Sequence, residues 1–487
     1  MSPGGSRQPM RVLFVANEVA PFAKVGGLAD VAGSLPPALA ELGVDVSVVM
    51  PLHQQVPTDA HGESALDALE VTAPHETRRA SVLEAELGDA GVPVYLIRYG
   101  PYFDRPEVYG PGGGDYPDSP QRYAFFARAA LALIPALGLD PHVIHCHDWP
   151  TGLLPAFERL SPTGRPTVYT IHNLGYQGQF DLDVAPRIGI DPASQAMRLV
   201  QFEGRINYMA AAIRSATVLS TVSVRYAHEI QTPDFGEGLD GLLRGRAADL
   251  YGILNGIDDA QWDPATDPAL PAHFSRGAMA GKQVCKAALQ REMGLPLDPD
   301  VPVVGAITRL VWQKGLDVLA QVLPRAVKLP IQFVLLGTGE PALEDSYRLL
   351  ARRYPEQMAI NIRYDDGLAR RIYAGSDIFV MPSRYEPCGL GQMMSMAYGT
   401  VPVVQATGGL ADTVVEASAE PTGFVFYGLA ADDLLFALER AVLAFRDRPR
   451  WEKLVARCMA QDFSWTESAR RYVDLYETAI ARHGCRR

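Results

Sequence analysis

The chain has 487 residues, of which 48% are hydrophobic and 21% charged, values typical of a folded globular protein with more than one domain. Its 44 Lys and Arg residues stand against 56 Asp and Glu residues, a formal charge of −12, which argues against nucleic acid or an anionic membrane as the main partner. Five scattered cysteines, no signal-peptide core and no run of roughly 18 apolar residues predict a cytoplasmic protein without a disulfide framework.

The first predicted unit is a strand over 12–16, a loop with one lysine and two glycines, and a helix over 28–42. Such a loop suits an anion, because free N–H groups and the positive end of the helix dipole face the ligand and Lys24 adds a full charge. Gly26 and Gly27 would let the ligand's oxygen atoms come close. A simple turn with a solvated lysine is the alternative, and these residues alone leave both open.

Strands alternate with helical segments along the rest of the chain, which predicts an α/β fold with doubly wound parallel sheets. In the first half the expected strands are 44–50, 92–97, 142–147, 167–171 and 217–223, with a helix over 121–137. In the second half they are 301–307, 332–336, 378–381 and 401–404. The pattern weakens over 255–276, where Asp, Pro and Gly are dense, and this change predicts a domain boundary.

We therefore expect four parts. They are a tail over 1–10, a first domain over 11–258, a second domain over 259–464 and a last helical segment over 465–487 that crosses back to the first domain.

Ligands of doubly wound sheets bind outside the carboxyl ends of the strands, so the polar residues there are candidates for a site. In the first half these residues are Lys24, Asp148, His172 and Asn173. His145 and His147 alternate on one strand and could flank a metal, but packing inside the sheet explains them equally well and matching ligands are missing nearby. We expect no metal site.

In the second half, Arg309 and Lys314 follow a strand closely enough to converge on one diphosphate, although two solvated residues at a helix start would look the same. Glu386 precedes another helix start, where it would bind sugar hydroxyls, move a proton or only complement the helix dipole. Cys388 is expected to be a packed residue and not a nucleophile, because no histidine lies near it in sequence.

The segment 101–126 is rich in aromatic residues, whose faces can stack on sugar rings. Tyr102, Tyr109 and Tyr116 are therefore candidates for binding an acceptor, the alternative being an ordinary loop with core anchors. A small repeat also links the two halves, since Gly-Gly-Leu-Ala-Asp occurs at 26–30 and again at 408–412, each time between a strand and a helix.

Taken together, these motifs resemble those of the bacterial glycogen synthases and plant starch synthases. The matching segments are KVGGLADV (24–31), HCHDW (145–149), TIHNLGYQG (170–178), TVS (221–223), GILNGID (252–258), RLVWQKGLD (309–317), PSRYEPCGLG (382–391) and TGGLAD (407–412). They occur in the family's order and cover nearly the whole chain.

The resemblance implies a GT-B type glycosyltransferase, with two Rossmann-like domains facing across a cleft. It implies transfer of glucose from ADP-glucose to the non-reducing end of glycogen or another α-1,4-glucan, with retention of configuration and without a metal or other cofactor. Two positions depart from the pattern, because Gly391 stands where Thr is common and Gln405 where Arg is common.

The resemblance also implies roles for individual residues. In the catalytic group, Arg309 and Lys314 stabilise the departing diphosphate, Glu386 holds glucose hydroxyls, His172 lines the glucose pocket and Asp148 lies towards the acceptor. The donor-binding group is Lys24, Gly26, Gly27, Asn173, Asn255, Cys388, Gly389, Leu390, Thr407, Gly408 and Gly409. Two rival functions stay open: a related retaining transferase with another nucleotide sugar or a small acceptor, and a catalytically silent protein that binds nucleotide sugar or glucan.

Overall fold

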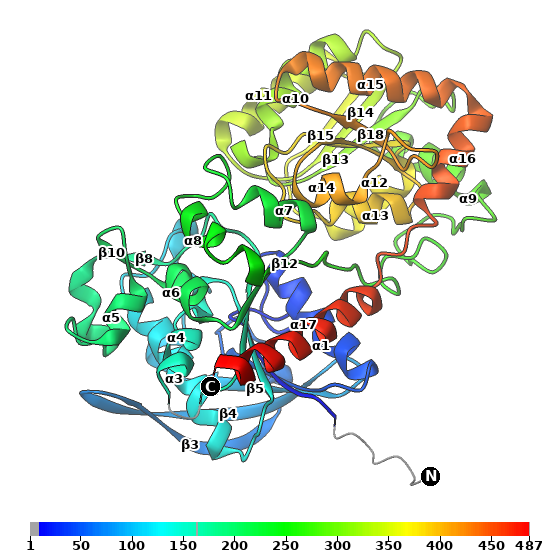
Figure 1. The fold of residues 1–487 in the computed structure, drawn as a ribbon. Coiled ribbons are helices and arrows are strands. Elements are labelled where there is room, and N and C mark those ends of the chain that lie inside the picture. Colours follow the sequence, from blue (N-terminus) through cyan, green and yellow to red (C-terminus); the bar gives the residue numbers. More distant parts are fainter. Residues whose placement is uncertain (1–8, 162–163, 487) are drawn as a thin grey trace. The chain divides into compact units, whose positions relative to one another are not determined.

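A computed structural model describes residues 9–161 and 164–486, and most of the tail expected over 1–10 lies outside these residues (Figure 1). The chain divides into two compact units. The first contains the described residues of Met1–Val222, Ala227–Ile253 and Trp465–Arg487, and the second contains Ser223–Tyr226 and Leu254–Ser464. The observed boundary thus falls after Ile253, not after Asp258, and the last helix belongs to the first unit.

The first unit is built on a nine-stranded sheet with the order β12-β11-β7-β6-β1-β2-β5-β4-β3. Its parallel strands are β1 (Arg11–Val15), β2 (Asp45–Pro51), β5 (Val92–Arg98), β6 (Val143–His147), β7 (Thr167–Ile171), β11 (Val218–Thr221) and β12 (Leu250–Gly252). The long hairpin of β3 (Glu63–Ala73) and β4 (Glu76–Leu87) joins β5 in antiparallel fashion. This hairpin was not predicted, because both strands are half solvated and carry many charged residues.

The helices of the first unit cover both faces of its sheet. They are α1 (Gly27–Glu41), α2 (Gly100–Phe103), α3 (Ser119–Ala136), α4 (Leu154–Leu160), α5 (Gln195–Val200), α6 (Tyr208–Ser215), α7 (Val224–Glu229, whose first residues fall in the second unit), α8 (Asp240–Arg244) and α17 (Trp465–Arg486). A small sheet of β8 (Gln179–Phe180), β10 (Arg205–Asn207) and β9 (Gln201–Phe202) lies beside them. Figure 1 shows α17, in red, alongside α1, and both helices contribute to one hydrophobic core with β1 and β2.

The second unit has a six-stranded parallel sheet with the order β15-β14-β13-β16-β17-β18. Its strands are β13 (Val303–Ile307), β14 (Gln332–Leu336), β15 (Met358–Asn361), β16 (Ile378–Met381), β17 (Val401–Gln405) and β18 (Phe424–Phe426). Its helices are α9 (Ala280–Glu292), α10 (Leu316–Ala326), α11 (Pro341–Arg353), α12 (Asp366–Gly375), α13 (Gly391–Ala397), α14 (Gly408–Thr413), α15 (Ala431–Arg446) and α16 (Arg448–Cys458).

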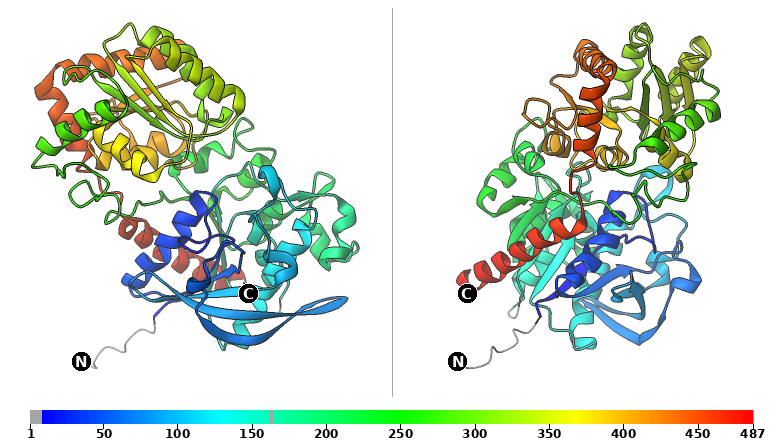
Figure 2. Two further views of the ribbon diagram at one scale, coloured as in Figure 1. Left: turned by 180° about the vertical axis from the view of Figure 1, so that it is seen from behind. Right: turned by 90° about the vertical axis from the view of Figure 1, so that its right-hand side faces the viewer.

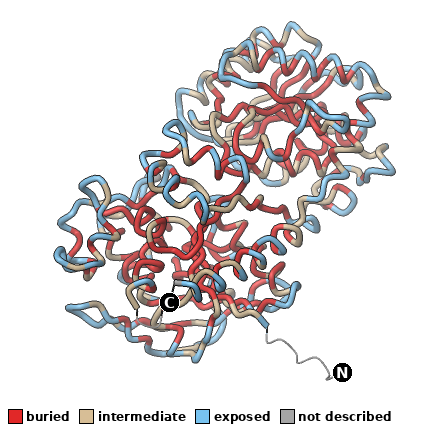
Figure 3. Tube along the Cα trace, in the orientation of Figure 1, coloured by how far each residue is buried: buried red, intermediate tan, exposed pale blue. Residues whose placement is uncertain are grey.

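Apolar side chains alternate between the two faces of this sheet and pack into two separate hydrophobic cores. Val304 and Phe333 pack in one cluster with α10 and α15, while the neighbouring Val303 and Val334 pack in another with α9 and α12. Because successive side chains of a strand point to opposite faces, the sheet is covered by helices on both sides. Figure 2 shows these two layers of helices, and Figure 3 shows the buried strands between them. The predicted doubly wound α/β fold is confirmed.

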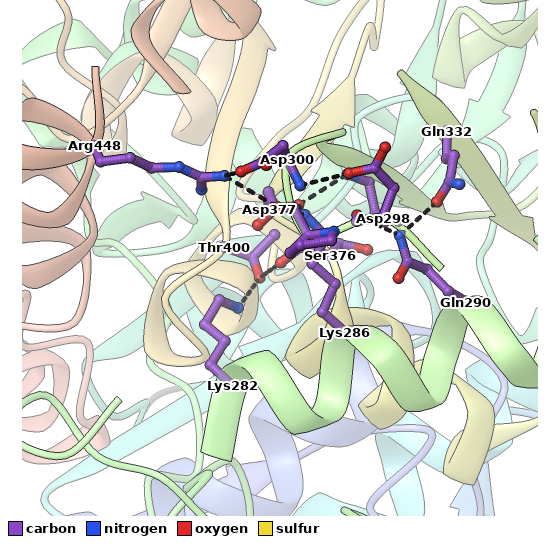
Figure 4. Close-up of polar contacts among 12 residues, drawn as sticks. Lys282, Lys286, Gln290, Asp298, Asp300, Gln332, Ser376, Asp377, Thr400 and Arg448 are labelled. Atoms are coloured by element: carbon purple, nitrogen blue, oxygen red, sulfur yellow. Dashed lines mark hydrogen bonds and ion pairs between the residues drawn. The ribbon is translucent and has the colours of Figure 1, made fainter. Parts of the chain in front are cut away.

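Helix α9 is anchored to the second sheet by buried polar side chains at four-residue spacing (Figure 4). Lys286 forms an ion pair of 2.8 Å with Asp377, and Lys282 donates to the carbonyls of Ala374 and Tyr398 and to the Thr400 hydroxyl. Burial lowers the pKa of Lys282 to about 8. These lysines hold the helix in register, because each ammonium group would be left unpaired by any shift of α9.

Among the described residues, no helix combines the length and the apolar character needed to cross a membrane.

Candidate active site

Each unit carries a group of polar residues at the carboxyl ends of its parallel strands. In the first unit these residues follow β1, β6 and β7, and in the second they follow β13, β16 and β17. The candidates from the sequence therefore lie at the carboxyl edge of each sheet, as expected.

The loop between β1 and α1 is held by a buried carboxylate. Glu18 Oε2 accepts hydrogen bonds from the backbone N–H groups of Val25, at 2.6 Å, and Gly26, at 3.0 Å, and Glu18 Oε1 accepts one from the Tyr109 hydroxyl, at 2.9 Å. The carboxylate thus occupies two of the amides that the sequence had offered to an anionic ligand. Sequence reasoning missed Glu18, because nothing in the spacing shows that its side chain turns back to the loop.

The rest of this loop is open. Gly26 and Gly27 are exposed, and a Cβ atom added at either would meet nothing within 4 Å, so no contact of the described chain requires glycine there. The N–H groups of Gly27 and Leu28, in the first turn of α1, have no carbonyl partner within the helix. Lys24 forms an exposed ion pair of 2.6 Å with Asp30. These features fit a loop that keeps donors and space for a ligand.

Asp148, after β6, has a strained backbone and an environment that opposes ionisation. Its φ and ψ of 54° and 179° are a combination that side-chain-bearing residues rarely adopt. Its Oδ1 accepts the backbone N–H of His172 at 2.8 Å. Burial raises the pKa of Asp148 to about 7, against the lowering effect of hydrogen bonds from the backbones of His172 and Asn173. Such strain is typical of functional sites.

Three histidines lie side by side at this edge and are neutral at pH 7. His147 Nδ1 and His172 Nε2 are 2.9 Å apart, and burial lowers the pKa of His172 to about 3. Burial also lowers the pKa of His145 well below its usual value, and this ring bonds to the hydroxyls of Tyr476 and Thr170 at 2.8 and 2.6 Å. Packing and hydrogen bonding therefore account for His145, while His172 lies at the end of the group, next to Asp148.

Among the residues that the structure describes, no group of three or more His, Cys, Asp or Glu side chains is arranged to hold a metal ion. The expectation that the protein works without a metal or other cofactor stays a prediction.

The three tyrosines proposed for acceptor binding have different environments. Tyr102 is buried and receives a hydrogen bond from Arg78, so its ring offers no free face to a sugar. Tyr116 lies beneath Arg105 and Arg122, whose guanidinium carbons are 4.7 and 4.9 Å from the ring centre. Tyr109 instead donates to Glu18 beside the open loop. Of the three, only Tyr109 has a hydrogen bond to the candidate site, and the structure argues against Tyr102 as an acceptor-binding residue.

In the second unit, Lys314 and Glu386 form a compact ion pair. Lys314 Nζ lies 2.6 Å from Glu386 Oε2, and the Ser383 hydroxyl donates to the same oxygen at 2.9 Å. Both side chains of the ion pair are largely buried. Arg309 is exposed and forms no ion pair with any described carboxylate. The arrangement leaves one free guanidinium, one fixed ammonium and a carboxylate whose Oε1 is open to accept further hydrogen bonds.

The loop that carries Glu386 is packed directly against the second glycine pair. A Cβ atom on Gly408 would come within 1.9 Å of the Glu386 carbonyl oxygen, and one on Gly409 within 1.9 Å of the Cys388 carbonyl oxygen. The Gly409 N–H donates to the Glu386 carbonyl at 3.1 Å. Gly408 and Gly409 therefore have a structural role in holding this loop, which the sequence analysis had not separated from donor binding.

Cys388 is buried, and burial raises the pKa of its thiol to about 12, against the lowering effect of a hydrogen bond with the Asn255 backbone. The prediction that it is not a nucleophile agrees with this environment. Asn255 is buried as well, and its Oδ1 has no partner among the described residues. Of the remaining donor-binding candidates, Gly389 has a φ of 73° and Leu390 precedes α13, so their backbones form the turn into that helix.

The two departures from the family pattern both lie in the second unit, Gly391 at the start of α13 and Gln405 at the end of β17. A Cβ atom at Gly391 would lie 3.2 Å from the Phe379 ring, so a side chain there requires its neighbours to move. Gln405 is buried, and its Oε1 has no partner among the described residues.

Tyr364 is an exposed aromatic residue that the sequence analysis did not single out. It follows β15 at the carboxyl edge of the second sheet and is 86% exposed. A single tyrosine in a polar segment gives no signal in the sequence, and only the topology brings it to this edge.

Comparison with known proteins identifies the two units. Residues 11–245 match the model of the starch synthase catalytic domain, and residues 301–443 match that of the glycosyl transferases group 1. The chain is 49% identical to a glycogen synthase of Anaeromyxobacter dehalogenans, over 96% of this chain and 99% of that one. It is 44% identical to glycogen synthase 2 of Geobacter sulfurreducens, over 96% and 99% of the two chains.

Solved structures agree with these matches. The catalytic domain of starch synthase IV from Arabidopsis thaliana, bound to ADP and acarbose, superposes with a TM-score of 0.87 at 33% identity, covering 97% of this chain and all of that one. A sucrose-phosphate synthase from Thermosynechococcus elongatus, at 19% identity and a TM-score of 0.61, shares the fold.

Each unit has charged groups at the carboxyl ends of its parallel strands. Together with the structural neighbours, this arrangement defines a glycosyltransferase of the GT-B fold. Within that class, the glycogen synthases named above align with 96% of this chain. The chain belongs to the glycogen and starch synthase family, as the sequence motifs predicted.

Proposed function

We propose that this protein is a glycogen synthase that transfers glucose from ADP-glucose to the non-reducing end of an α-1,4-glucan, with retention at the anomeric carbon. The observation that carries the proposal is the buried Glu386 carboxylate, fixed by Lys314 and Ser383 at the carboxyl edge that also carries the unpaired Arg309. Similarity to glycogen synthases over nearly the full length supports the same reaction.

The leaving group of this reaction is a nucleoside diphosphate, so negative charge grows on its phosphate in the transition state. Arg309 has no described carboxylate partner to compete with that phosphate, and a guanidinium fork suits two phosphate oxygens. Lys314 supplies a second positive charge whose position is set by Glu386. Charges fixed before the reaction stabilise the leaving group without reorganising during it.

Glu386 has a second task in this proposal. Lys314 and Ser383 both donate to Oε2, so Oε1 is left to accept hydrogen bonds from glucose hydroxyls. The sugar would then be oriented by the same carboxylate that positions the lysine. A variant without this carboxylate should lose both functions together.

The first unit carries neutral, ionisable and cationic candidates for this reaction. His172, with a pKa of about 3, would bond to a sugar hydroxyl without introducing charge. Asp148, with a pKa of about 7, would accept a hydrogen bond from the incoming glucan hydroxyl in its ionised form. Lys24, beside the open glycine loop, would meet the donor diphosphate.

The choice of ADP rests on an exposed aromatic residue of the second unit. The exposed ring of Tyr364 lies at the carboxyl edge of the second sheet, where it could stack on a nucleotide base, and a purine offers a larger stacking surface than a pyrimidine. The cytoplasmic location expected from the sequence is part of the same proposal.

The direct test is transfer by the purified protein. ADP-glucose or UDP-glucose is supplied with glycogen, and glucan elongation and nucleoside diphosphate release are measured together. We expect elongation with ADP-glucose, a lower kcat/KM with UDP-glucose and α-configured product linkages by NMR. Absence of elongation with both donors would contradict the proposal, and donor binding without turnover would favour the silent binding protein.

Lys24→Ala is the companion variant for the first unit. Loss of a charge-assisted contact of about 1.4 kcal/mol should raise the KM for the donor roughly tenfold. Because the Lys24 ion pair is exposed, the melting temperature should stay unchanged. An unaltered donor KM would remove Lys24 from the site.

A further inference from the structure

A second basic group lies in the first unit, away from the residues discussed so far. Arg159 at the end of α4, Arg214 at the end of α6 and Arg246 after α8 line a cavity of about 400 Å³. The rest of its wall consists of apolar side chains and glycines: Leu199, Ile213, Gly241, Leu242 and Gly245. We call this the arginine cavity.

The arginine cavity and the candidate active site lie at opposite edges of the sheet. Arg214 comes shortly before β11, and Arg246 shortly before β12, so both residues lie at the amino ends of these strands. Strands β11 and β12 run parallel to β7 and β6, whose carboxyl ends carry His172 and Asp148. The length of the strands therefore separates the two sites, and no residue is shared between them.

Each arginine binds backbone carbonyls, but only one is neutralised. Arg246 pairs with Asp249 at 2.9 Å and gives its other donors to carbonyls around the end of α6. Arg214 gives Nη1 to the carbonyls of Arg198, Leu199 and Gln201, and Arg159 gives Nη1 to the carbonyl of Arg214.

The remaining donors of Arg159 and Arg214 have no acceptor in the part of the chain that the structure describes. Among the described residues neither side chain forms an ion pair with a carboxylate, and the Nε and Nη2 groups of both have no hydrogen-bond partner. Neither guanidinium is thus neutralised by a carboxylate of the described residues, in a chain whose formal charge is −12, and that of Arg214 lies 5.3 Å from the centre of the Phe202 ring. An anion bound in the cavity would be attracted to both positive charges.

We propose that the arginine cavity binds a phosphate monoester about the size of a monosaccharide. A phosphate monoester carries about −1.5 to −2 charges at pH 7, which matches the two guanidinium groups without a carboxylate partner. Guanidinium forks bind phosphate oxygens in pairs. The apolar side chains of Leu199, Ile213 and Leu242 would contact the body of the ligand, and the volume lies in the range of roughly 300–1,000 Å³ common for small-molecule sites.

Isothermal calorimetry with inorganic phosphate, a hexose monophosphate and a dicarboxylate tests the proposal. Saturating ADP is included to occupy the donor site, which itself binds phosphate under the proposed function. We expect the hexose monophosphate to bind best. Equal affinity for inorganic phosphate would overturn the role of the apolar wall, and tighter binding of the dicarboxylate would overturn the assignment to phosphate.

Three variants locate the binding. Arg159→Gln and Leu242→Glu should each weaken it at least about tenfold, because the first removes a donor fork and the second adds a negative charge to the wall. Arg244→Gln is the matched control, since this arginine of the same segment pairs with Asp240 at 2.6 Å and does not line the cavity. Melting temperatures confirm that each variant is folded.

The outcome separates this proposal from the proposed function. Glucan elongation should be retained in Arg159→Gln and Leu242→Glu, because neither residue belongs to the candidate active site. Absence of binding at millimolar concentrations of all probes, or binding that both variants leave unchanged, would overturn the arginine cavity as a phosphate site.

Discussion

The pentapeptide Gly-Gly-Leu-Ala-Asp occurs at 26–30 and at 408–412, and both copies open a helix at the carboxyl edge of a parallel sheet. In the second copy the glycines let the chain pass within contact of the Glu386 loop, and any Cβ atom would collide with that backbone. In the first copy a Cβ atom would meet nothing within 4 Å. One sequence thus serves packing at 408–412 and leaves open space at 26–30, so the role of a glycine motif is decided by its surroundings.

The largest expected effect concerns the carboxylate that the second copy supports. Glu386→Ala removes the partner of a largely buried lysine and the acceptor proposed for the sugar, so kcat should fall by about 10³-fold. Glu386→Gln keeps the shape and should recover stability without recovering turnover. Steady-state kinetics and thermal melting of both variants measure the two contributions. If Glu386→Ala kept a turnover near that of wild type, the second copy of the pentapeptide would have a structural role only.

Gly409→Ala tests the packing role directly. The added methyl group lies 1.9 Å from the Cys388 carbonyl oxygen, so the Glu386 loop must move, and we expect a loss of about 3 kcal/mol of stability together with most of the activity. Chemical denaturation and transfer assays measure both. Gly484→Ala, at a glycine whose Cβ would meet nothing, is the control for the substitution itself. A stable, active Gly409→Ala protein would contradict the proposed close contact.

Asp148 contrasts with Glu386, because it has a strained backbone and no ion pair. Its pKa of about 7 lies above the ordinary value of 3.8, so ionisation destabilises the folded state, and this effect develops as the pH rises from about 4 to about 7. Asp148→Asn should therefore gain up to about 4 kcal/mol over wild type at pH 8, a difference that disappears near pH 4, while transfer is impaired. Melting curves across this pH range measure the gain. A gain independent of pH would show that ionisation is not its cause.

Features that depend on local sequence patterns were predictable, and features that depend on contacts between distant loops were not. Apolar strand runs predicted both parallel sheets, and the polar residues that follow these strands were correctly expected at one edge of each sheet, because the carboxyl ends of parallel strands meet there by topology. The β3–β4 hairpin was not predicted, since its solvated strands lack an apolar pattern. Glu18 and the contacts of Gly408 were not predictable, because each depends on where another loop lies in the folded chain.

Glu18 fixes the loop of the first copy, and its removal should affect the donor more than the fold. Glu18→Gln keeps an acceptor for one N–H group but loses the charge that fixes Val25, Gly26 and Tyr109, so the donor KM should rise about tenfold, the scale of about 1.4 kcal/mol. Tyr109→Phe removes one of these contacts and should show a smaller rise. An equal donor KM for wild type and Glu18→Gln would show that donor binding does not depend on how Glu18 fixes the loop.

The smallest expected change in stability is at Gly26, and it completes the comparison. Gly26→Ala adds a methyl group into open space, at a residue whose φ of −140° any amino acid adopts, so the free energy of unfolding should change by less than about 1 kcal/mol. If a donor approaches this loop, the same methyl group should raise the donor KM several-fold. Kinetics and denaturation of Gly26→Ala and Gly409→Ala should be measured side by side. Gly26→Ala should then change only the affinity for the donor, whereas Gly409→Ala should lower both stability and turnover. Unchanged affinity in Gly26→Ala would mean that no ligand comes close to the first copy.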